Sequence, residues 1–376
     1  MLWRTGATGN DDGEEAVIAL KAITTPSAAL MNRFRYAGKF GLLGAVVALA
    51  IALLLWQIIA ERNRAITAME HERIGLQYLD VVRPAWMAIQ RHRRMSATMA
   101  NGDLSVSDAL AKEQAAIDKQ LAQVTAMIEQ QPVLAPLGEK WKIQAGKWDG
   151  VKKDAQTLAE AQGFERHTRY LEALDAHVRA AAAQTSLTLD PVLGRNLLIG
   201  VAVNELPAFI EAAAKLRGLT ASVVARKRIS ETDAAGLREL MAQLKLAQNQ
   251  LADRIKTAAP LLGDTGKTVT AAVSALDGPV TDAFGQLELH VFSESFDVDA
   301  KTFFNEETSP VAAGIKAAKI VNGELDMLLQ AGSAELKRSL ALTAGAAGIV
   351  VLMLLYLGLG MYFSVADSVQ AVVDGG

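Results

Sequence analysis

Two long apolar stretches without a charged residue constrain this chain more than any other feature. Residues 40–60 read FGLLGAVVALAIALLLWQIIA, and residues 339–366 are likewise uncharged, with the centre GAAGIVVLMLLYLGLGMYF. At 1.5 Å per residue, each stretch is long enough to cross the ~30 Å hydrocarbon core of a bilayer. A cleaved signal peptide is the alternative for the first stretch, but such signals have only roughly 7–15 apolar residues. The sequence therefore predicts two membrane-spanning helices.

Basic residues next to the first stretch predict the orientation of the chain. Arg33, Arg35 and Lys39 precede it, and basic residues are enriched on the cytoplasmic side of a membrane. Two spans would place both termini in the cytoplasm and the intervening residues in the periplasm of a Gram-negative bacterium. We therefore expect a multi-pass protein of the bacterial inner membrane. Its expected parts are a largely disordered cytoplasmic tail at 1–37, membrane helices at 38–60 and 339–363, and a periplasmic domain at 61–338.

The composition excludes several kinds of chemistry. The 376 residues have a formal net charge of -3 and include no cysteine. This charge gives no reason to expect nucleic acid as a partner, and the lack of cysteine excludes disulfides, thiolate metal sites and a cysteine nucleophile. The 5 histidines are scattered, and the sequence has no Gly-rich phosphate loop, HExxH or GxSxG motif. We expect neither an enzyme nor a cofactor or metal site.

Residues 61–338 have the apolar spacing of three and four that is typical of bundled helices, without convincing strand alternation. Breakers near 101–103, 132–136, 163, 190–191, 227–230, 260–266 and 293–299 divide the region into about eight segments. We predict an all-α fold in which these long helices form two four-helix-bundle modules. The clearest apolar seam continues into the second uncharged stretch and comprises Val311, Ile315, Ala318, Asn322, Leu325, Leu329, Gly332, Leu336, Ser339 and Thr343.

A weak internal repeat supports the bundle interpretation. Residues 83–110, RPAWMAIQRHRRMSATMANGDLSVSDAL, resemble residues 206–237, LPAFIEAAAKLRGLTASVVARKRISETDAAGL. Both copies begin with Pro-Ala-aromatic, and both restart after a turn with Ser-x-x-Asp, at Ser105 and Ser230. That pattern resembles a capping box, in which the serine hydroxyl accepts a bond from a free backbone N–H. The repeat indicates two related helical hairpins.

Four potentially cationic side chains are adjacent at residues 91–94, Arg-His-Arg-Arg, on a predicted amphipathic helix. The helical register places Arg217 on the apolar seam of the second hairpin, while at least one of Arg91 and Arg94 should face solvent. His92 is more typical of a surface or helix-capping residue than of a ligand. The register also places Arg93 on the seam of the first hairpin, with Leu79, Val82, Trp86, Gln90, Ala97 and Ala100.

An arginine that faces a bundle interior is costly unless it is paired, because burial removes its hydration. Two kinds of partner remain open for Arg93 and Arg217. One is a carboxylate of the protein itself, such as Glu205, Glu211 or Asp103. The other is a small exogenous carboxylate or oxyanion, which guanidinium groups bind in bidentate fashion. The basic run at 225–228 is most simply a solvated helix end, where cations suit the helix dipole.

Three stretches resemble the sensor half of bacterial transmembrane receptors, especially methyl-accepting chemotaxis proteins. They read ERIGLQYLDVVRPAWMAIQRHRRMSATMANGD, LTLDPVLGRNLLIGVAVNELPAFIEAAAKLRGL and KTFFNEETSPVAAGIKAAKIVNGELDMLL, and the resemblance extends over residues 38–376. It implies a periplasmic domain of the helical bimodular or nitrate/nitrite-sensing kind. In the latter, arginines at positions matching Arg93, Arg94 and Arg217 would bind the anion. With the adjacent His92, these residues are the candidate ligand-binding set.

The last residues, YFSVADSVQAVVDGG, look like the approach to a HAMP linker, so residues 364–376 are expected to begin this cytoplasmic relay. The leading hypothesis is a homodimeric receptor that binds a small anion or a periplasmic partner, contacts membrane lipid and signals to cytoplasmic partners, above all in chemotaxis. One alternative is the sensor half of a histidine kinase or diguanylate cyclase. Another is a structural or interaction protein whose arginines are closed by internal salt bridges.

Overall fold

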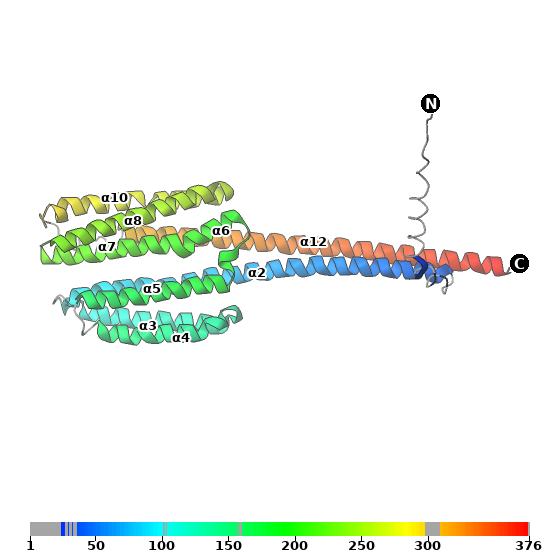
Figure 1. Ribbon diagram of the computed structural model, residues 1–376, viewed down its shortest axis with the longest axis horizontal. Helices are drawn as coiled ribbons and strands as arrows, with labels where there is room; N and C mark the ends of the chain where they lie inside the picture. Colours follow the sequence, from blue (N-terminus) through cyan, green and yellow to red (C-terminus); the bar gives the residue numbers. More distant parts are fainter. Residues whose placement is uncertain are drawn as a thin grey trace, which may run out of the picture. The chain divides into compact units, whose positions relative to one another are not determined.

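A computed structural model describes residues 24–26, 29, 32, 36–100, 102, 104–155, 157, 160–297 and 309–374. It is all-α, as predicted, and 92% helical. The fold class follows from abundant Ala and Leu, which lose little entropy in a helix, and from scarce β-branched runs. Two helices of 65 residues each are the longest in these ranges, α2 (Tyr36–Ala100) and α12 (Pro310–Asp374) (Figure 1).

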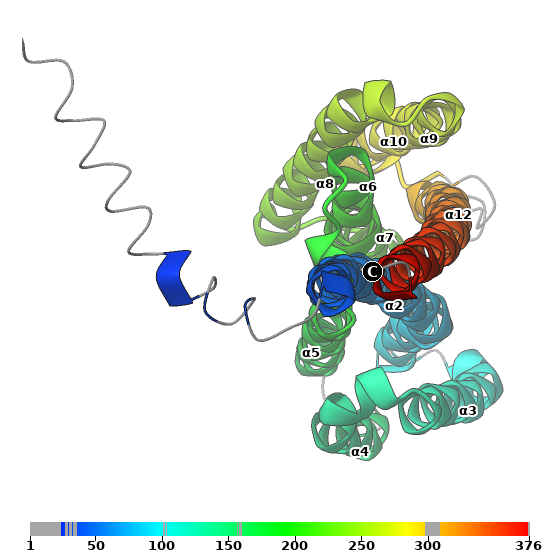
Figure 2. The ribbon, with the colours of Figure 1, turned by 90° about the vertical axis from the view of Figure 1, so that its right-hand side faces the viewer.

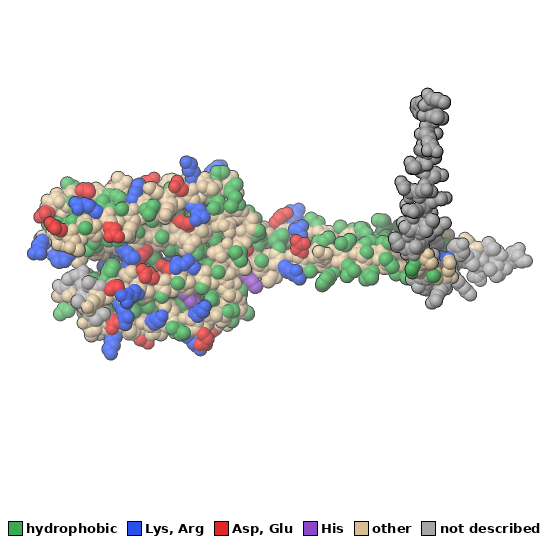
Figure 3. Space-filling view, viewed as in Figure 1, with side chains coloured by type: hydrophobic (Ala, Val, Ile, Leu, Met, Phe, Trp, Pro, Cys, Tyr) green, Lys and Arg blue, Asp and Glu red, His purple; other side chains and the backbone are tan. Residues whose placement is uncertain are grey.

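The chain divides into two compact units, of which the first comprises Met1–Arg64 and Leu336–Gly376. In this unit the apolar side chains of α2 and α12 are largely exposed; Trp56 is 70% exposed and Tyr356 is 77% exposed. Figure 3 shows these side chains as a mostly green surface along the two helices. An apolar surface of this extent requires a covering that water does not provide.

Among the described residues, three helices are long and apolar enough to cross a membrane, namely Gly41–Ala100, Leu193–Arg226 and Pro310–Val365. The first and last contain the two predicted stretches, and the most apolar segment of each is not buried within the protein at all. The middle helix was not predicted as a span. Within the protein, 61% of its most apolar segment is buried, so its apolar residues are those of a core helix. Arg33 and Arg35, on which the predicted orientation depends, lie outside the described residues.

The second unit, Ala65–Glu335, contains two groups of helices (Figures 1 and 2). In the first group, α3, α4 and α5 accompany the end of α2; in the second, α6 to α10 accompany the beginning of α12. A π-helical turn, Val201–Glu205, joins α6 to α7, and another, Leu287–Phe292, follows α10. The shorter helices are α3 (Ser107–Gln130), α4 (Gly138–Asp154), α5 (Glu160–Gln184), α6 (Leu193–Gly200), α7 (Leu206–Arg226), α8 (Glu231–Ala258), α9 (Asp264–Ser274) and α10 (Asp277–Gln286).

Most predicted breakers coincide with helix ends, but the two predicted capping boxes differ. Ser230 accepts a bond from the backbone N–H of Asp233, whose carboxylate accepts in return, and this complete capping box begins α8. By contrast, α3 begins at Ser107 after a 3-10 turn, with Val106 as its N-cap and no side-chain cap. The box predicted at Ser105 was therefore wrong, because the tighter turn moves the N-cap one residue along the chain, to Val106. The break between α9 and α10 was not predicted, although Gly278-Pro279 in the first turn of α10 is a breaker signal.

The two prolines of the repeat occupy different backbone surroundings. Pro84 lies inside the continuous helix α2, whereas Pro207 is the second residue of α7, just after the π-helical turn that ends at Glu205. Proline cannot donate to the carbonyl four residues before it, and a wider turn is one way for a helix to accommodate this loss. The hairpins thus share the proline but not its local geometry.

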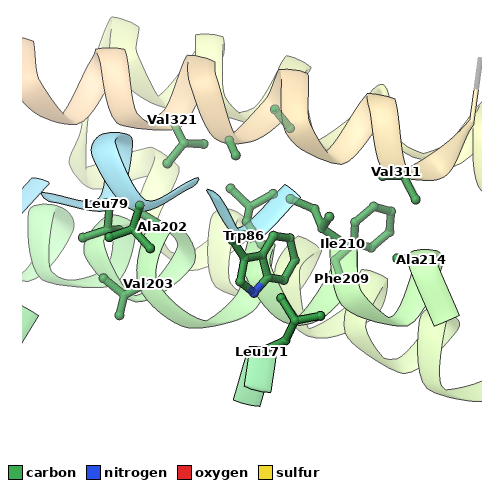
Figure 4. Close-up of a cluster of buried hydrophobic side chains, with 14 of the residues drawn as sticks. Leu79, Trp86, Leu171, Ala202, Val203, Phe209, Ile210, Ala214, Val311 and Val321 are labelled. Carbon is green, nitrogen blue, oxygen red and sulfur yellow. The ribbon is translucent and has the colours of Figure 1, made fainter. Parts of the chain in front are cut away.

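Trp86 connects the two helix groups in the core. It is 5% exposed, and Figure 4 shows its indole between Leu171 of α5, Ile210 of α7 and the α12 residue Val321. An aromatic side chain of this size buries roughly 150–250 Å². The predicted seam on α12 is confirmed in this unit, since Val311, Ala318, Asn322, Leu325 and Leu329 are all buried.

Candidate functional site

The four adjacent side chains of residues 91–94 point in different directions around α2, as their register requires. Arg91 is partly exposed and pairs with Glu113 of α3, its Nη2 lying 2.7 Å from Oε1. His92 and Arg93 are buried, at 0% and 2% exposure. Arg94 is half-buried and engages neighbouring groups. The cluster is therefore not one basic patch but several separate environments.

Arg93 is held by a carboxylate of the protein. Its Nη1 lies 2.8 Å from Oε1 of Glu211 on α7, and its Nη2 lies 3.4 Å from Oε2. The same Nη1 donates to the hydroxyl of Thr168 on α5 at 3.0 Å, and the guanidinium stacks 4.5 Å from the centre of the Phe164 ring. Of the two partners left open by the sequence, the structure contains the internal carboxylate.

Glu211 receives further bonds that hold it in place. Gln90 donates to its Oε2 at 2.6 Å, and the Lys215 ammonium lies 3.7 Å from Oε1. Because Arg93 and Gln90 belong to α2, Thr168 to α5 and Glu211 to α7, this cluster connects the two helix groups by charge-assisted bonds. Bonds to an ionised group are roughly twice as strong as neutral ones.

His92 is not the surface or capping residue that its sequence context suggested. Its Nδ1 lies 2.7 Å from Nε2 of His167 on α5, 75 residues later in the chain. His167 Nδ1 lies 2.7 Å from the Gly163 carbonyl, and His92 Nε2 lies 3.1 Å from the Gln114 amide nitrogen. A carbonyl only accepts, so His167 Nδ1 carries the proton, His92 Nδ1 donates to His167, and Gln114 donates to His92. Both rings are neutral in this arrangement.

Burial sets the protonation of this histidine pair. Desolvation lowers the pKa of His92 to about 3, helped by the neighbouring His167 and Lys152. Desolvation likewise lowers the pKa of His167 to about 4, and the positive charge of Arg93 acts in the same direction. The indole of Trp148 packs edge-on against His92, with ring centres 5.0 Å apart. At neutral pH the pair is therefore an uncharged part of the core that responds to acid.

The other residues considered as ligands or partners lie in several places. Arg217 lies half-buried on α7, the helix that carries Glu211, and it engages neighbouring groups. Glu205, one of the carboxylates considered as a partner, pairs instead with Arg254 at 2.6 Å. Asp103 lies outside the described residues. The exposed run at 225–228 ends α7, as predicted.

A second inward-facing arginine, Arg83, was missed by sequence analysis. Only 13% of its side chain is exposed, and its one carboxylate contact among the described residues is with Asp80, 3.5 Å from Nη1. Burial lowers the pKa of Arg83, opposed by the Asp80 charge. The sequence did indicate that Arg83 could face inward. A step of four residues from Leu79 and then three to Trp86 passes through Arg83, whereas a step of three and then four passes through Val82.

Arg83 lines two adjacent hollows. One is a groove of about 460 Å³ between α2 and α12, whose charged lining residues are Asp80, Arg83, Lys319 and Asp326. The other is a largely apolar cavity of about 40 Å³, lined also by Trp86 and Ile210, where Arg83 and Asp175 are the charged members. Both hollows share Arg83 and Met87. The geometry suits a small ligand with a polar head and a short apolar part.

No metal-binding group of three or more His, Cys, Asp or Glu residues occurs within the described ranges. Comparison with known proteins adds no further constraint on these clusters. No family model, no curated protein and no solved structure matches the chain.

Proposed function

We propose that this protein is a membrane receptor that senses a small ligand with its helical domain and passes the signal to a cytoplasmic output module. The continuity of α2 and α12 is the observation that carries this proposal. Each is one helix that contains both an apolar stretch and residues packed in the helical core. A continuous helix transmits a shift along its axis because its backbone hydrogen bonds keep it rigid.

In the proposed topology, residues 38–60 and 339–363 cross the bacterial inner membrane, and residues 61–338 form two four-helix-bundle modules in the periplasm. The third apolar helix, Leu193–Arg226, belongs to the core of this domain, which agrees with its burial. Both termini are then cytoplasmic, and residues 364–376 lead into a HAMP-like relay. The receptor acts as a homodimer, with chemotaxis as the leading output. A histidine kinase or diguanylate cyclase output would use the same sensor half.

A small anion is the proposed ligand at Arg93, with Arg94, Arg217 and His92 as the neighbouring candidates. Because Glu211 already holds Arg93, the anion would act by competing with that carboxylate. Displacement of Glu211 would loosen one link between α2 and α7. Such a switch needs only two packings that differ by a few kcal/mol and a ligand that prefers one of them.

A structural or interaction protein is the second candidate function, and the Arg93–Glu211 pair favours it. A guanidinium that already has a bidentate carboxylate, a hydroxyl and an aromatic ring around it has little need of an exogenous anion. In that case the cluster serves to fix the packing of the helix groups. The two candidates differ in one measurable respect, which is whether anions stabilise the protein through Arg93.

The test uses the full chain in lipid nanodiscs and measures its melting temperature with nitrate, nitrite and small carboxylates. The receptor proposal predicts a saturable rise, lost in Arg93→Ala and Arg217→Ala, because a ligand that binds only the folded state stabilises it by mass action. Arg169→Ala, at an exposed ion pair with Glu165, is the matched control and should keep the rise. No rise with any anion, together with strongly destabilised Arg93→Ala, would instead assign the cluster to structure.

Signal transmission needs a second readout. The chain contains no cysteine, so Ser364→Cys on α12 can carry a single spin label without any other substitution. A ligand-dependent change in the label spectrum or in label-to-label distance would support the receptor. A label spectrum and label-to-label distance that do not change when a ligand binds would contradict the receptor proposal.

A further inference from the structure

The groove between α2 and α12 has a distinctive balance of charges. Arg83 and Asp80 line it from α2, and Lys319 and Asp326 line it from α12, so two cations face two anions. An anion would be repelled by the two carboxylates, and a cation would be repelled by Arg83 and Lys319. A small molecule that carries both signs matches the groove better.

The groove residues differ in how fully their charges are already used. Asp326 binds Arg73 at 2.9 Å through Oδ1 and Gln330 through Oδ2, so both of its oxygens are occupied. Asp80 accepts from the Asn322 amide at 2.7 Å and contacts Arg83 at 3.5 Å, both through Oδ1. Asp80 is also 55% exposed. Its second oxygen therefore remains for an incoming donor, as does the buried Oδ1 of Asn322, which has no hydrogen-bond partner among the described residues.

The cations of the groove are less well satisfied than its acids. Arg83 is a largely buried guanidinium with one marginal carboxylate contact. Within the described part of the chain, no carboxylate lies within ion-pair distance of the exposed Lys319 ammonium. Burial of a guanidinium without good partners is costly, and a ligand carboxylate would supply the bidentate partner that Arg83 lacks.

The adjacent cavity limits the size of the apolar part of such a ligand. Its volume of about 40 Å³ compares with roughly 10–15 Å³ needed by one water molecule, so it has room for a short alkyl group. Its walls include Leu79, Val82, Trp86, Ile315 and Ala318. The second charged lining residue, Asp175, lies in surroundings that raise its pKa to about 7, chiefly by burial. Its negative charge is accordingly reduced near neutral pH.

We propose that this groove and cavity bind a free α-amino acid with a short apolar side chain. Arg83 and Lys319 hold the carboxylate, Asp80 accepts from the ammonium, and the side chain enters the cavity. The site is separate from the Arg93 cluster. It deepens the proposed receptor function, because a ligand there bridges α2 and α12, the two helices that continue into the apolar stretches. The binding claim itself does not depend on signalling.

The first test is isothermal titration calorimetry of the full chain in nanodiscs with glycine, L-alanine, L-2-aminobutyrate and L-norvaline. Affinity should rise roughly fourfold per methylene until the cavity is filled. The matched carboxylic acids without an amino group and the matched amines without a carboxylate should bind at least ~10-fold more weakly, as expected on loss of one charged contact. Absence of saturable binding by any amino acid, or equal binding of the acids and amines, would overturn the proposal.

Four variants assign the roles of the groove residues. Arg83→Gln and Lys319→Ala should each weaken amino-acid binding, by at least ~10-fold for the buried arginine. Asp80→Asn should remove the preference for an amino acid over its des-amino analogue. Lys316→Ala, at an exposed lysine of the same helix that lines neither hollow, is the control and should bind normally. Wild-type affinity in Arg83→Gln would contradict the site.

The cavity is tested by Ala318→Val, which adds two methyl groups to its wall. This variant should bind glycine as the wild type does but lose the gain in affinity from alanine to norvaline. An unchanged gain in a variant whose melting temperature shows normal folding would exclude the cavity as the side-chain pocket.

The Ser364→Cys spin label separates failure of this site from failure of the receptor proposal. Amino-acid binding that requires Arg83 but leaves the label unchanged supports the site and contradicts the receptor. A label response to anions that persists in Arg83→Gln, without amino-acid binding in the wild type, supports the receptor and overturns the site.

Discussion

Arg83 and Arg93 lie ten residues apart on the same helix and face the interior, yet their surroundings differ sharply. Arg93 has a bidentate carboxylate, a hydroxyl and an aromatic ring around its guanidinium. Arg83 has a single contact at 3.5 Å to an acid that is half in solvent. The comparison teaches that burial of an arginine does not by itself mark a ligand site. The partners already present decide whether the charge contributes to structure or remains available for binding.

Removal of the countercharge tests this difference most strongly. Glu211→Gln should lower the free energy of unfolding by about 3–5 kcal/mol, because it leaves Arg93 buried without its carboxylate. The equivalent change for Arg83 is Asp80→Asn, which removes the charge of its carboxylate partner. It should cost at most about 0.5 kcal/mol, since a long contact to an exposed acid contributes little. Urea unfolding of both variants measures these values. Similar losses in the two would remove the distinction between the arginines.

Replacement of each arginine by methionine should give opposite signs. Arg93→Met leaves Glu211 without its main partner and should destabilise the protein by about 3 kcal/mol. Arg83→Met removes a desolvated charge that has no good partner and should stabilise the ligand-free protein by about 1 kcal/mol. Thermal and urea unfolding in the absence of amino acids provide the comparison. A destabilised Arg83→Met would show that Asp80 is a better partner than its geometry suggests.

The region of Arg93 should also respond to acid through the histidine pair. The pKa of His92 falls from 6.5 in the unfolded chain to about 3 when folded, so the unfolded state binds the proton first. The stability contributed by neutral His92 is present above pH 6.5 and is lost as pH falls towards 3, by about 1.4 kcal/mol per unit. The stability difference between the wild type and His92→Gln should therefore shrink by about 2 kcal/mol between pH 6.5 and 5.

The experiment must compare the wild type with His92→Gln, rather than follow the wild type alone, because other groups change the stability with pH in the opposite direction. The pKa values of Glu72 and Asp175 are both raised to about 7, mainly by burial. Each therefore takes up a proton in the folded state first and adds stability as pH falls through 7. Thr98→Ala removes a hydroxyl that donates only to a backbone carbonyl, that of Arg94, and should give a difference that is independent of pH. A pH-independent difference for His92→Gln would contradict the neutral buried pair.

Among the changes around Arg93, the smallest expected effect concerns its neutral partner, Thr168. Thr168→Val keeps the shape of the side chain but removes the hydroxyl that accepts from Nη1 at 3.0 Å. It should cost about 1–2 kcal/mol, because the hydroxyl also donates to the Phe164 carbonyl and each hydrogen bond contributes roughly 1 kcal/mol. Chemical denaturation of the variant measures this cost. A loss as large as that of Glu211→Gln would mean that Thr168, rather than the carboxylate, dominates the surroundings of Arg93.

The helical fold was predictable from local pattern, but the site was predictable only in part. Arg93 was expected on a seam and Glu211 was one of three acids considered as its partner, because a register of three and four defines which side of a helix is buried. The pairing of His92 with His167 was not foreseen, since the two are 75 residues apart and lie on separate helices. Arg83 was overlooked because the seam between Leu79 and Trp86 was drawn through Val82, and the register allows either residue.

The sequence by itself determined the helices, most of their ends, the two uncharged apolar stretches and the inward seam of α12. These features depend on interactions between residues within a few positions of each other and on the cost of exposing apolar surface. Only the tertiary structure decided that Glu211 reaches Arg93, that His92 is buried against His167 and that a groove opens beside Arg83. Such contacts depend on which helices become neighbours and on their relative rotation, and these follow from packing of the whole core.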